Sequence, residues 1–152
     1  MIIKGFPLGP TSNHMLMQSR GRLIKSPEAR IYDSRIDSFY LYNKKSLDEI
    51  ANKIKGSLLR VDMYFVFLYS KIIGKEGQVK QTDYSNRVKM SQDGLARCLQ
   101  IDDKLIKCGF LELVTCDTEE DEQIIFRILK TNKIRTFSEI KGELNTYENK
   151  TL

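Results

Sequence analysis

The stretch LLRVDMYFVFL at residues 58–68 decides the fold of this chain. Consecutive side chains of a β-strand point to opposite faces, so a strand with one buried face alternates between apolar and polar residues. The apolar residues that would share one face here are Leu59, Val61, Met63, Phe65 and Phe67. The other face would carry Arg60, Asp62 and Tyr64. The alternation therefore predicts a half-buried strand.

The chain that precedes this strand begins with two segments of different character. Residues 2–8 (IIKGFPL) are mostly apolar and are followed by Gly9-Pro10, which is typical of a short opening strand. Residues 11–25 are polar and basic, and this segment is longer than a bare connection requires. We therefore expect a long loop with a functional role at residues 11–25.

Two helix-start signals follow this loop. Ser26-Pro27-Glu28 supplies an N-cap, a proline at the first helical position and an acidic residue in the first turn, so a helix should begin here and run to about Tyr42. Residues 43–45 interrupt the pattern. The capping box at residues 46–49 (SLDE) then predicts a second helix, which ends at Gly56.

A basic loop and a third helix are expected next. Residues 71–81 contain three lysines and two glycines with little periodicity, which predicts a mobile basic loop. From Tyr84 to Leu99 the apolar residues recur at helical spacing, and Lys89 and Asp93 fall on the opposite, polar side. Gly94 in the middle of this helix suggests either close packing or a tolerated local weakness.

The rest of the chain predicts two further strands and a tail. Residues 104–116 and 123–130 are apolar runs separated by an acidic turn, which most simply form a β-hairpin whose tip points away from any DNA. Residues 131–152 are polar, but Phe137, Ile140 and Leu144 are spaced for a short amphipathic helix. The order of elements indicates an α+β domain with helices packed on a small mixed sheet.

Composition limits the class of protein. The 152 residues suit one domain, and 41% hydrophobic residues with a mean hydropathy of -0.38 are typical of a soluble globular protein without membrane spans. The first residues do not resemble a signal peptide, so we expect the protein in the cytoplasm. A net charge of +5 is compatible with a polyanionic partner.

The three cysteines, Cys98, Cys108 and Cys116, predict neither a disulfide framework nor a zinc site. Their number is odd, and no two of them have the CxxC spacing that zinc sites use. They also fall within apolar elements. We expect them to be small buried hydrophobic residues.

The acidic residues concentrate in TDYSNRVKMSQDGLARCLQIDD at residues 82–103. Hydrolysis of a phosphodiester needs an activated water, stabilisation of negative charge and assistance to the leaving oxygen. Mg²⁺ can supply all three, and it prefers carboxylate, water and phosphate oxygens. Several acids with one lysine are therefore typical of a nuclease site. The acids in this stretch are Asp83, Asp93, Asp102 and Asp103.

Structural interpretations of the same residues stay open. Asp83 has the position of a helix N-cap, and Lys89 with Asp93 forms an i, i+4 charge pair of the kind found on exposed helices. A helix of this length separates its two ends by ~20 Å. For Asp83 and Asp103 to meet, the chain after the helix must therefore return along it, or a second copy must contribute. Asp102 and Asp103 would begin the next strand and point to opposite faces, so we expect only one of them to bind a metal.

The string DYSNRVKMSQDGL, followed by IDD, resembles the signature of the RusA-type Holliday-junction endonucleases. That signature is approximately D-x-D-N-x-x-K-x-x-x-D-x-L, with a pair of aspartates about ten residues later. GPTSNH at residues 9–14, with RGR downstream, resembles the family's P-P-S-N-N loop and its basic continuation, and residues 71–81 match its basic loop. The resemblance spans residues 3–128. The residues that match the signature are Asp83, Asn86, Lys89, Asp93, Leu95, Asp102 and Asp103.

The resemblance implies a RusA-like endonuclease domain at residues 1–130, with residues 131–152 outside it. Such a protein would be a homodimer that uses Mg²⁺, or Mn²⁺, to resolve four-way DNA junctions by paired symmetric nicks. It would be associated with the nucleoid and encoded by a bacterium or a phage, with no membrane partner and no small-molecule substrate.

The resemblance also assigns roles to single residues. Asp83 and Asp103 would bind the metal, with Asp102 and Ser85 as the other candidate ligands. Lys89 would contact phosphate or stabilise developing charge. Asn86 and Asp93 would orient the acids. The residues expected to contact DNA are Asn13, His14, Arg20, Arg22, Lys25, Lys75 and Lys80.

One position departs from the family pattern. The family has a second aspartate two residues after the first, and this chain has Ser85 there. Ser85 could coordinate through its hydroxyl or a water, or Asp93 or Asp102 could replace the missing carboxylate. The alternative function is a catalytically weak protein that binds branched DNA, and a third possibility is an α+β interaction module with no DNA role.

Overall fold

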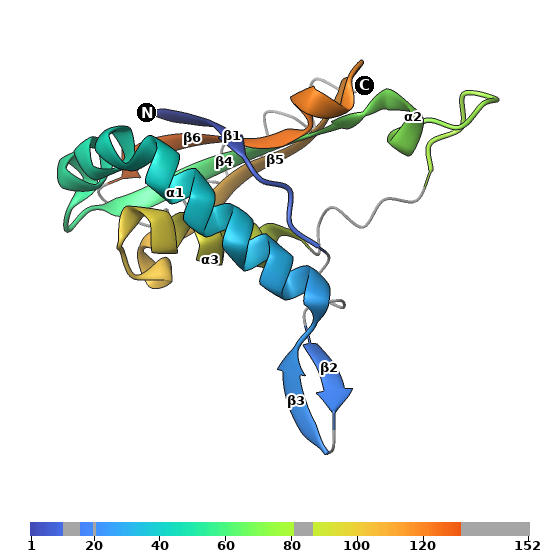
Figure 1. Ribbon diagram of the computed structural model, residues 1–152. Coiled ribbons are helices and arrows are strands. Elements are labelled where there is room, and N and C mark those ends of the chain that lie inside the picture. Colours follow the sequence, from blue (N-terminus) through green and yellow to red (C-terminus); the bar gives the residue numbers. More distant parts are fainter. Residues whose placement is uncertain (11–15, 20, 81–86, 132–152) are drawn as a thin grey trace, which may run out of the picture.

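The structure is a computed structural model that describes residues 1–10, 16–19, 21–80 and 87–131. A four-stranded sheet in the order β1-β6-β4-β5 forms its centre (Figure 1). The strands are β1 (Ile2–Phe6), β4 (Leu58–Leu68), β5 (Ile106–Cys116) and β6 (Gln123–Thr131). Strand β4 runs parallel to β5 and antiparallel to β6, and β6 runs antiparallel to β1. The expected α+β fold with a small mixed sheet is confirmed.

Three α-helices accompany this sheet in the described part of the chain. They are α1 (Pro27–Ile54), the short α2 (Tyr69–Ile72) and α3 (Val88–Leu99). Helices α1 and α3 cover one face of the sheet (Figure 1), and their apolar side chains join those of the sheet in one core. None of these helices is long and apolar enough to cross a membrane.

Strand β4 has the predicted alternation. The five apolar residues of the predicted face are all buried, at 0–7% exposure, and they pack in the core beneath α1 and α3. The opposite face departs from the expectation at two positions, because Val66 is buried and Asp62 is completely buried. Its carboxylate accepts hydrogen bonds from Arg60, Arg127 and the backbone N–H of Phe110 at 2.6–3.1 Å. A buried carboxylate thus fixes two half-exposed guanidinium groups on the sheet.

The first helix begins as predicted, but the prediction of two separate helices is wrong. The Oγ of Ser26 accepts the N–H of Ala29 at 3.0 Å, which caps α1, and the helix then continues without a break to Ile54. Its buried residues Ile36, Leu47 and Ile54 are spaced by whole helical turns, so one apolar stripe spans the expected interruption. The start signal at Ser46 is overridden by this packing.

The prediction of a β-hairpin at residues 104–130 is also wrong. Strands β5 and β6 follow each other in the chain, but β4 lies between them and pairs with both. The reason is that β4 is buried along most of its length and therefore takes a central place in the sheet. The acidic turn between β5 and β6 pairs with α2, where Lys71 Nζ lies 2.7 Å from Glu122 and 3.6 Å from Glu119.

The segment at residues 11–25 is not simply a loop. Strands β2 (Leu16–Ser19) and β3 (Arg22–Lys25) pair antiparallel and form a separate two-stranded hairpin that projects from the body (Figure 1). The apolar pairs Leu16-Met17 and Leu23-Ile24 are too short to predict a strand in a stretch whose overall composition is polar. We call this element the β2–β3 arm.

The remaining expectations are met in part. The opening strand ends at Phe6, two residues earlier than predicted. In the segment predicted as a mobile basic loop, residues 71–72 belong to α2, and Ile73 then bridges Val79 across a turn. Cys98 is buried as expected, whereas Cys116 is only partly buried. The predicted helix start at Tyr84 and the predicted helix near Phe137 lie outside the described residues.

Candidate active site

Helix α3 carries the polar side chains of the candidate site on its outer face. Its inner face is buried through Leu95, Cys98 and Leu99, so the opposite side is exposed to solvent. Lys89 lies in the first turn on this exposed side, and Asp93 lies one turn later. The Nζ of Lys89 is 2.6 Å from Oδ1 of Asp93.

The chain returns along α3 after the helix ends. Gln100 has a left-handed backbone with φ of 53°, and the N–H of Ile101 donates to the carbonyl of Ala96 at 3.0 Å, which reverses the chain direction. Asp103 follows and places Oδ2 at 2.7 Å from Nζ of Lys89. The convergence of Asp103 with Lys89 is therefore achieved within one chain, without a second copy.

Asp102 and Asp103 do not begin the next strand, which corrects that prediction. They form the start of a short 3-10 helix, Asp103–Leu105, ahead of β5. The carboxylate of Asp102 caps this turn by accepting the N–H of Lys104 at 3.0 Å. Asp103 is thus the member of the pair that reaches Lys89, while Asp102 has a local structural partner.

Lys89, Asp93 and Asp103 form one ion-pair cluster, which we call the Lys89 cluster. Within it, Lys89 and Asp103 shift each other's pKa. Hydrogen bonds to Asp103 and Asp93 raise the pKa of Lys89, and the hydrogen bond from Lys89 lowers the pKa of Asp103. Both groups are therefore ionised at neutral pH. Their side chains are 62% and 42% exposed, and ion pairs this exposed contribute little to stability. Stability alone does not explain why the three side chains converge.

Two of the described residues, Asp93 and Asp103, could contribute carboxylates to a divalent-cation site, and both now contact Lys89 Nζ. Asp93 and Asp103 direct two carboxylates at one cationic position, and Mg²⁺ is commonly bound by one or two carboxylates plus water and phosphate oxygens. No group of three or more histidine, cysteine, aspartate or glutamate side chains close enough to hold a metal occurs within the described ranges. The other expected ligands, Asp83 and Ser85, and the orienting residue Asn86 lie outside those ranges.

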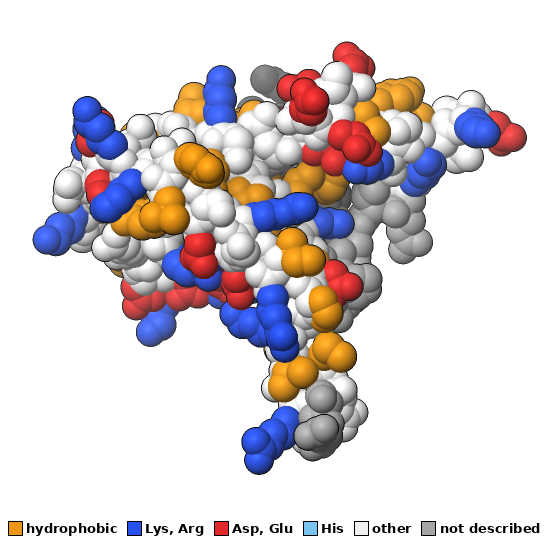
Figure 2. Space-filling view, viewed as in Figure 1, with side chains coloured by type: hydrophobic (Ala, Val, Ile, Leu, Met, Phe, Trp, Pro, Cys, Tyr) orange, Lys and Arg blue, Asp and Glu red, His pale blue; other side chains and the backbone are white. Residues whose placement is uncertain are grey.

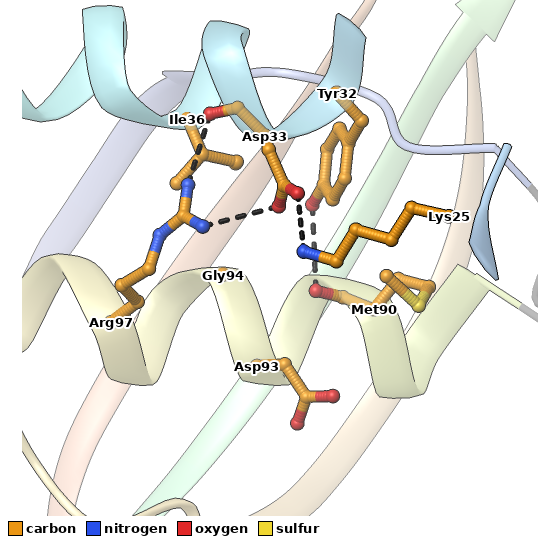
Figure 3. Close-up of a pocket in the computed structure, with 8 residues that line it drawn as sticks. All are labelled: Lys25, Tyr32, Asp33, Ile36, Met90, Asp93, Gly94 and Arg97. Atoms are coloured by element: carbon orange, nitrogen blue, oxygen red, sulfur yellow. Dashed lines mark hydrogen bonds and ion pairs between the residues drawn. The ribbon is translucent and has the colours of Figure 1, made fainter. Parts of the chain in front are cut away.

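A pocket of about 290 Å³ adjoins the cluster where α1 crosses α3 (Figure 3). The helices approach closely because residue 94 is glycine, and a Cβ there would lie 3.1 Å from Phe6 and 3.2 Å from Ile36. The close packing suggested by Gly94 is therefore confirmed. The residues that line this pocket are Lys25, Tyr32, Asp33, Ile36, Met90, Asp93, Gly94 and Arg97.

Lys25, one of the expected DNA contacts, enters this pocket from the end of β3. Its Nζ lies 2.6 Å from Asp33 on α1, and Asp33 also accepts a hydrogen bond from Arg97 on α3 at 3.1 Å (Figure 3). Lys25 and Asp93 line the same pocket, so the base of the β2–β3 arm lies beside the Lys89 cluster. Asp33 and Arg97 had no signal in the sequence, because their pairing depends on how two helices cross.

The other expected DNA contacts are spread over two places. Arg22 is exposed on β3, in the β2–β3 arm. Lys75 is exposed in the turn after α2, and the Nζ of Lys80 donates to the carbonyl of Ser70 at 2.5 Å. The expected contacts Asn13, His14 and Arg20 lie outside the part of the chain that the structure describes.

Arg87, at the start of α3, has a role that sequence reasoning missed. Its guanidinium donates to the carbonyl of Gly9 and lies 5.5 Å from the centre of the Phe67 ring. The segment after β1 is thereby held against the start of α3. This contact joins Gly9, where the GPTSNH motif begins, to the acidic stretch at residues 82–103.

Comparison with known proteins adds no family assignment. No protein-family model matches the chain, and no curated protein matches it.

Proposed function

We propose that this protein is a RusA-like, Mg²⁺-dependent endodeoxyribonuclease that resolves four-way DNA junctions as a homodimer. The observation that carries the proposal is the convergence of Asp103 and Asp93 on Lys89. These residues stand at three positions of the family-like signature. The return of the chain after α3 brings Asp103 back to Lys89.

Each side chain has a chemical part in the proposed reaction. Lys89 contacts the scissile phosphate and stabilises the negative charge that develops on it, exchanging one of its carboxylate partners for a phosphate oxygen. Asp103 and Asp83 would hold the metal, with Ser85, Asp93 or Asp102 completing the set. The bound Mg²⁺ supplies an activated water and neutralises charge on the phosphate.

Homodimerisation belongs to the proposal for a geometric reason. A four-way junction is resolved by two symmetric nicks, and a two-fold dimer presents two identical sites at a fixed spacing. Phosphate contacts from the basic residues supply most of the affinity, so binding should weaken steeply as the salt concentration rises.

A second candidate is a protein that binds branched DNA and cleaves it poorly. Ser85 favours this candidate, because the resemblance leads us to expect a carboxylate there. Binding would then use the same basic surfaces, and the Lys89 cluster would serve mainly to hold phosphate.

Incubation of the purified protein with a synthetic four-way junction tests the proposal. Cleavage products should appear with Mg²⁺, disappear with a chelator, and fall sharply in Asp83→Asn. A junction that stays intact with Mg²⁺ while it is bound tightly would favour the second candidate. A junction that is neither bound at low salt nor cleaved would contradict both.

A further inference from the structure

The β2–β3 arm has no partner within the described chain that could stabilise it by burial. It pairs Leu16 with Lys25, Met17 with Ile24 and Gln18 with Leu23. It makes no pairing with the four-stranded sheet and extends away from the body (Figure 1). An isolated two-stranded hairpin is only marginally stable in water, so an arm of this kind is expected to be completed by a binding partner.

The apolar side chains of the arm lie on both of its faces. Residues paired directly across an antiparallel ladder share a face, so Leu16 and Leu23 lie on one side while Met17 and Ile24 lie on the other. Leu23 is 73% exposed, Leu16 is 55% exposed and Met17 is 43% exposed. A hairpin that rests on a protein surface needs one apolar face. Apolar residues on both faces suit an element that inserts between two surfaces.

The charge of the arm points to a polyanion as its partner. In the sequence, residues 11–25 contain Arg20, Arg22 and Lys25 and no aspartate or glutamate. Basic and hydrophobic side chains gather on the projecting arm (Figure 2). The turn of the arm, SRGR at residues 19–22, is polar and basic, and Leu23 follows it directly. Basic groups beside exposed aliphatic side chains are the pattern of proteins that insert an aliphatic wedge between DNA bases, where the basic groups contact the flanking phosphates.

The base of the arm is attached next to the candidate active site. Lys25, the last residue of β3, is paired with Asp33, and the next residue, Ser26, caps α1. Lys25 lines the same pocket as Asp93, whose carboxylate binds Lys89. DNA whose phosphate lies at Lys89 would therefore pass close to the root of the arm.

From these observations we propose that the β2–β3 arm is a wedge that inserts Leu23 between bases at the branch point of a DNA junction. Arg22 would contact a phosphate beside the insertion. The cost of unstacking is lowest where stacking is already interrupted, so the wedge would favour branch points over continuous duplex. This inference rests on the proposed function and adds to it the residue that recognises the branch.

The test uses the full chain, a chelator to prevent cleavage, and two DNAs: a four-way junction and a linear duplex of the same length. Each carries 2-aminopurine, whose fluorescence rises on unstacking, at the branch point or at the matching duplex position. Leu23→Ser is compared with Leu41→Ser, since Leu41 is 70% exposed on α1 and lies outside the arm.

We expect the unaltered protein and Leu41→Ser to raise the fluorescence of the junction, and Leu23→Ser to lose this rise. Leu23→Ser should also bind the junction about tenfold more weakly while its affinity for the duplex stays the same. Unchanged fluorescence and affinity in Leu23→Ser would overturn the wedge.

Sedimentation of the same variants separates a protein partner from DNA. If Leu23→Ser changes the oligomeric state and leaves junction binding intact, the arm seats on a second copy and the wedge is overturned. Failure of the unaltered protein to bind the junction would contradict the proposed function itself, and the wedge with it. The two failures are therefore distinguishable.

Discussion

Lys89 Nζ lies 2.7 Å from Asp103 Oδ2, although Lys89 is in the first turn of α3 and Asp103 comes four residues after the end of that helix. The contact depends on the left-handed turn at Gln100, which sends the chain back along the helix. The lysine also binds Asp93, so one cation is shared by two carboxylates. This arrangement is the basis of the proposed nuclease site.

Lys89→Ala should abolish most cleavage while leaving the fold intact. Removal of a group that stabilises developing charge typically lowers a rate by about 10²–10³-fold. The cluster is exposed, so the unfolding midpoint should hardly change. The readouts are single-turnover junction cleavage and thermal unfolding.

Lys44→Ala provides the matched control for Lys89→Ala. Lys44 pairs with Asp48 at 2.5 Å across one turn of α1, and its side chain is 56% exposed. This variant should cleave like the unaltered protein. Equal losses in both variants would mean that Lys89 has no special role.

Ser85→Asp distinguishes an active nuclease from a weak one. On the proposed function the unaltered protein already cleaves, so adding the carboxylate that the family pattern has should raise the rate by less than about tenfold. The rate of junction cleavage at saturating Mg²⁺ measures this. A change from undetectable to rapid cleavage would instead indicate that the natural protein mainly binds DNA.

Asp62→Asn should lower stability at neutral pH by about 2 kcal/mol. Burial by itself raises the pKa of Asp62, but hydrogen bonds from Arg127 and Arg60 outweigh it and hold the pKa below its ordinary value. The arginine side chains are 47% and 50% exposed, so water can solvate them once the carboxylate is gone. The free energy of unfolding in urea measures the loss.

The lowered pKa of Asp62 also predicts how stability depends on pH. Because the pKa of Asp62 is lower in the folded state than in the unfolded state, its contribution is present above about pH 4 and is lost as the pH falls through the folded-state pKa. Asp62→Asn should therefore lose less stability than the unaltered protein between about pH 4 and pH 2. Parallel curves for the two proteins would contradict this account of Asp62.

Gly94→Val should destabilise the protein by about 1–3 kcal/mol, because even a Cβ would crowd Phe6, Ile36 and Tyr32 at the crossing of α1 and α3. Valine is a better helix former than glycine, so helix propensity predicts the opposite sign. Gln92→Val, in the same helix but only partly buried, controls for the effect of a β-branched residue. Urea unfolding of both variants gives the comparison.

The sequence predicted the structural features that depend on residues close together in the chain. The alternation around Met63 identified β4, the Ser26 cap gave the start of α1, and the pattern of Lys89 and Asp93 gave the polar face of α3. Each of these depends on residues within a few positions of one another. The mixed sheet and the helices packed on it followed from the order of such elements.

Features that depend on packing between distant segments were missed. The sequence signal at Ser46 indicated a new helix, but the apolar stripe through Leu47 keeps α1 continuous. The pairing of β5 with β4, rather than with β6, depends on which strand is most buried. The contact of Asp103 with Lys89 required the turn at Gln100, for which no glycine marked the left-handed position.

Junction cleavage by Asp103→Asn, with Asp48→Asn beside it, tests the central claim most directly. Asp48 is also paired with a lysine one turn away, and its side chain is 38% exposed, close to the 42% of Asp103. We predict that the unaltered protein and Asp48→Asn cleave a four-way junction with Mg²⁺, while Asp103→Asn binds it and cleaves about a hundredfold more slowly. Equal cleavage by Asp103→Asn and Asp48→Asn, or an absence of Mg²⁺-dependent cleavage by the unaltered protein, would contradict the proposed site.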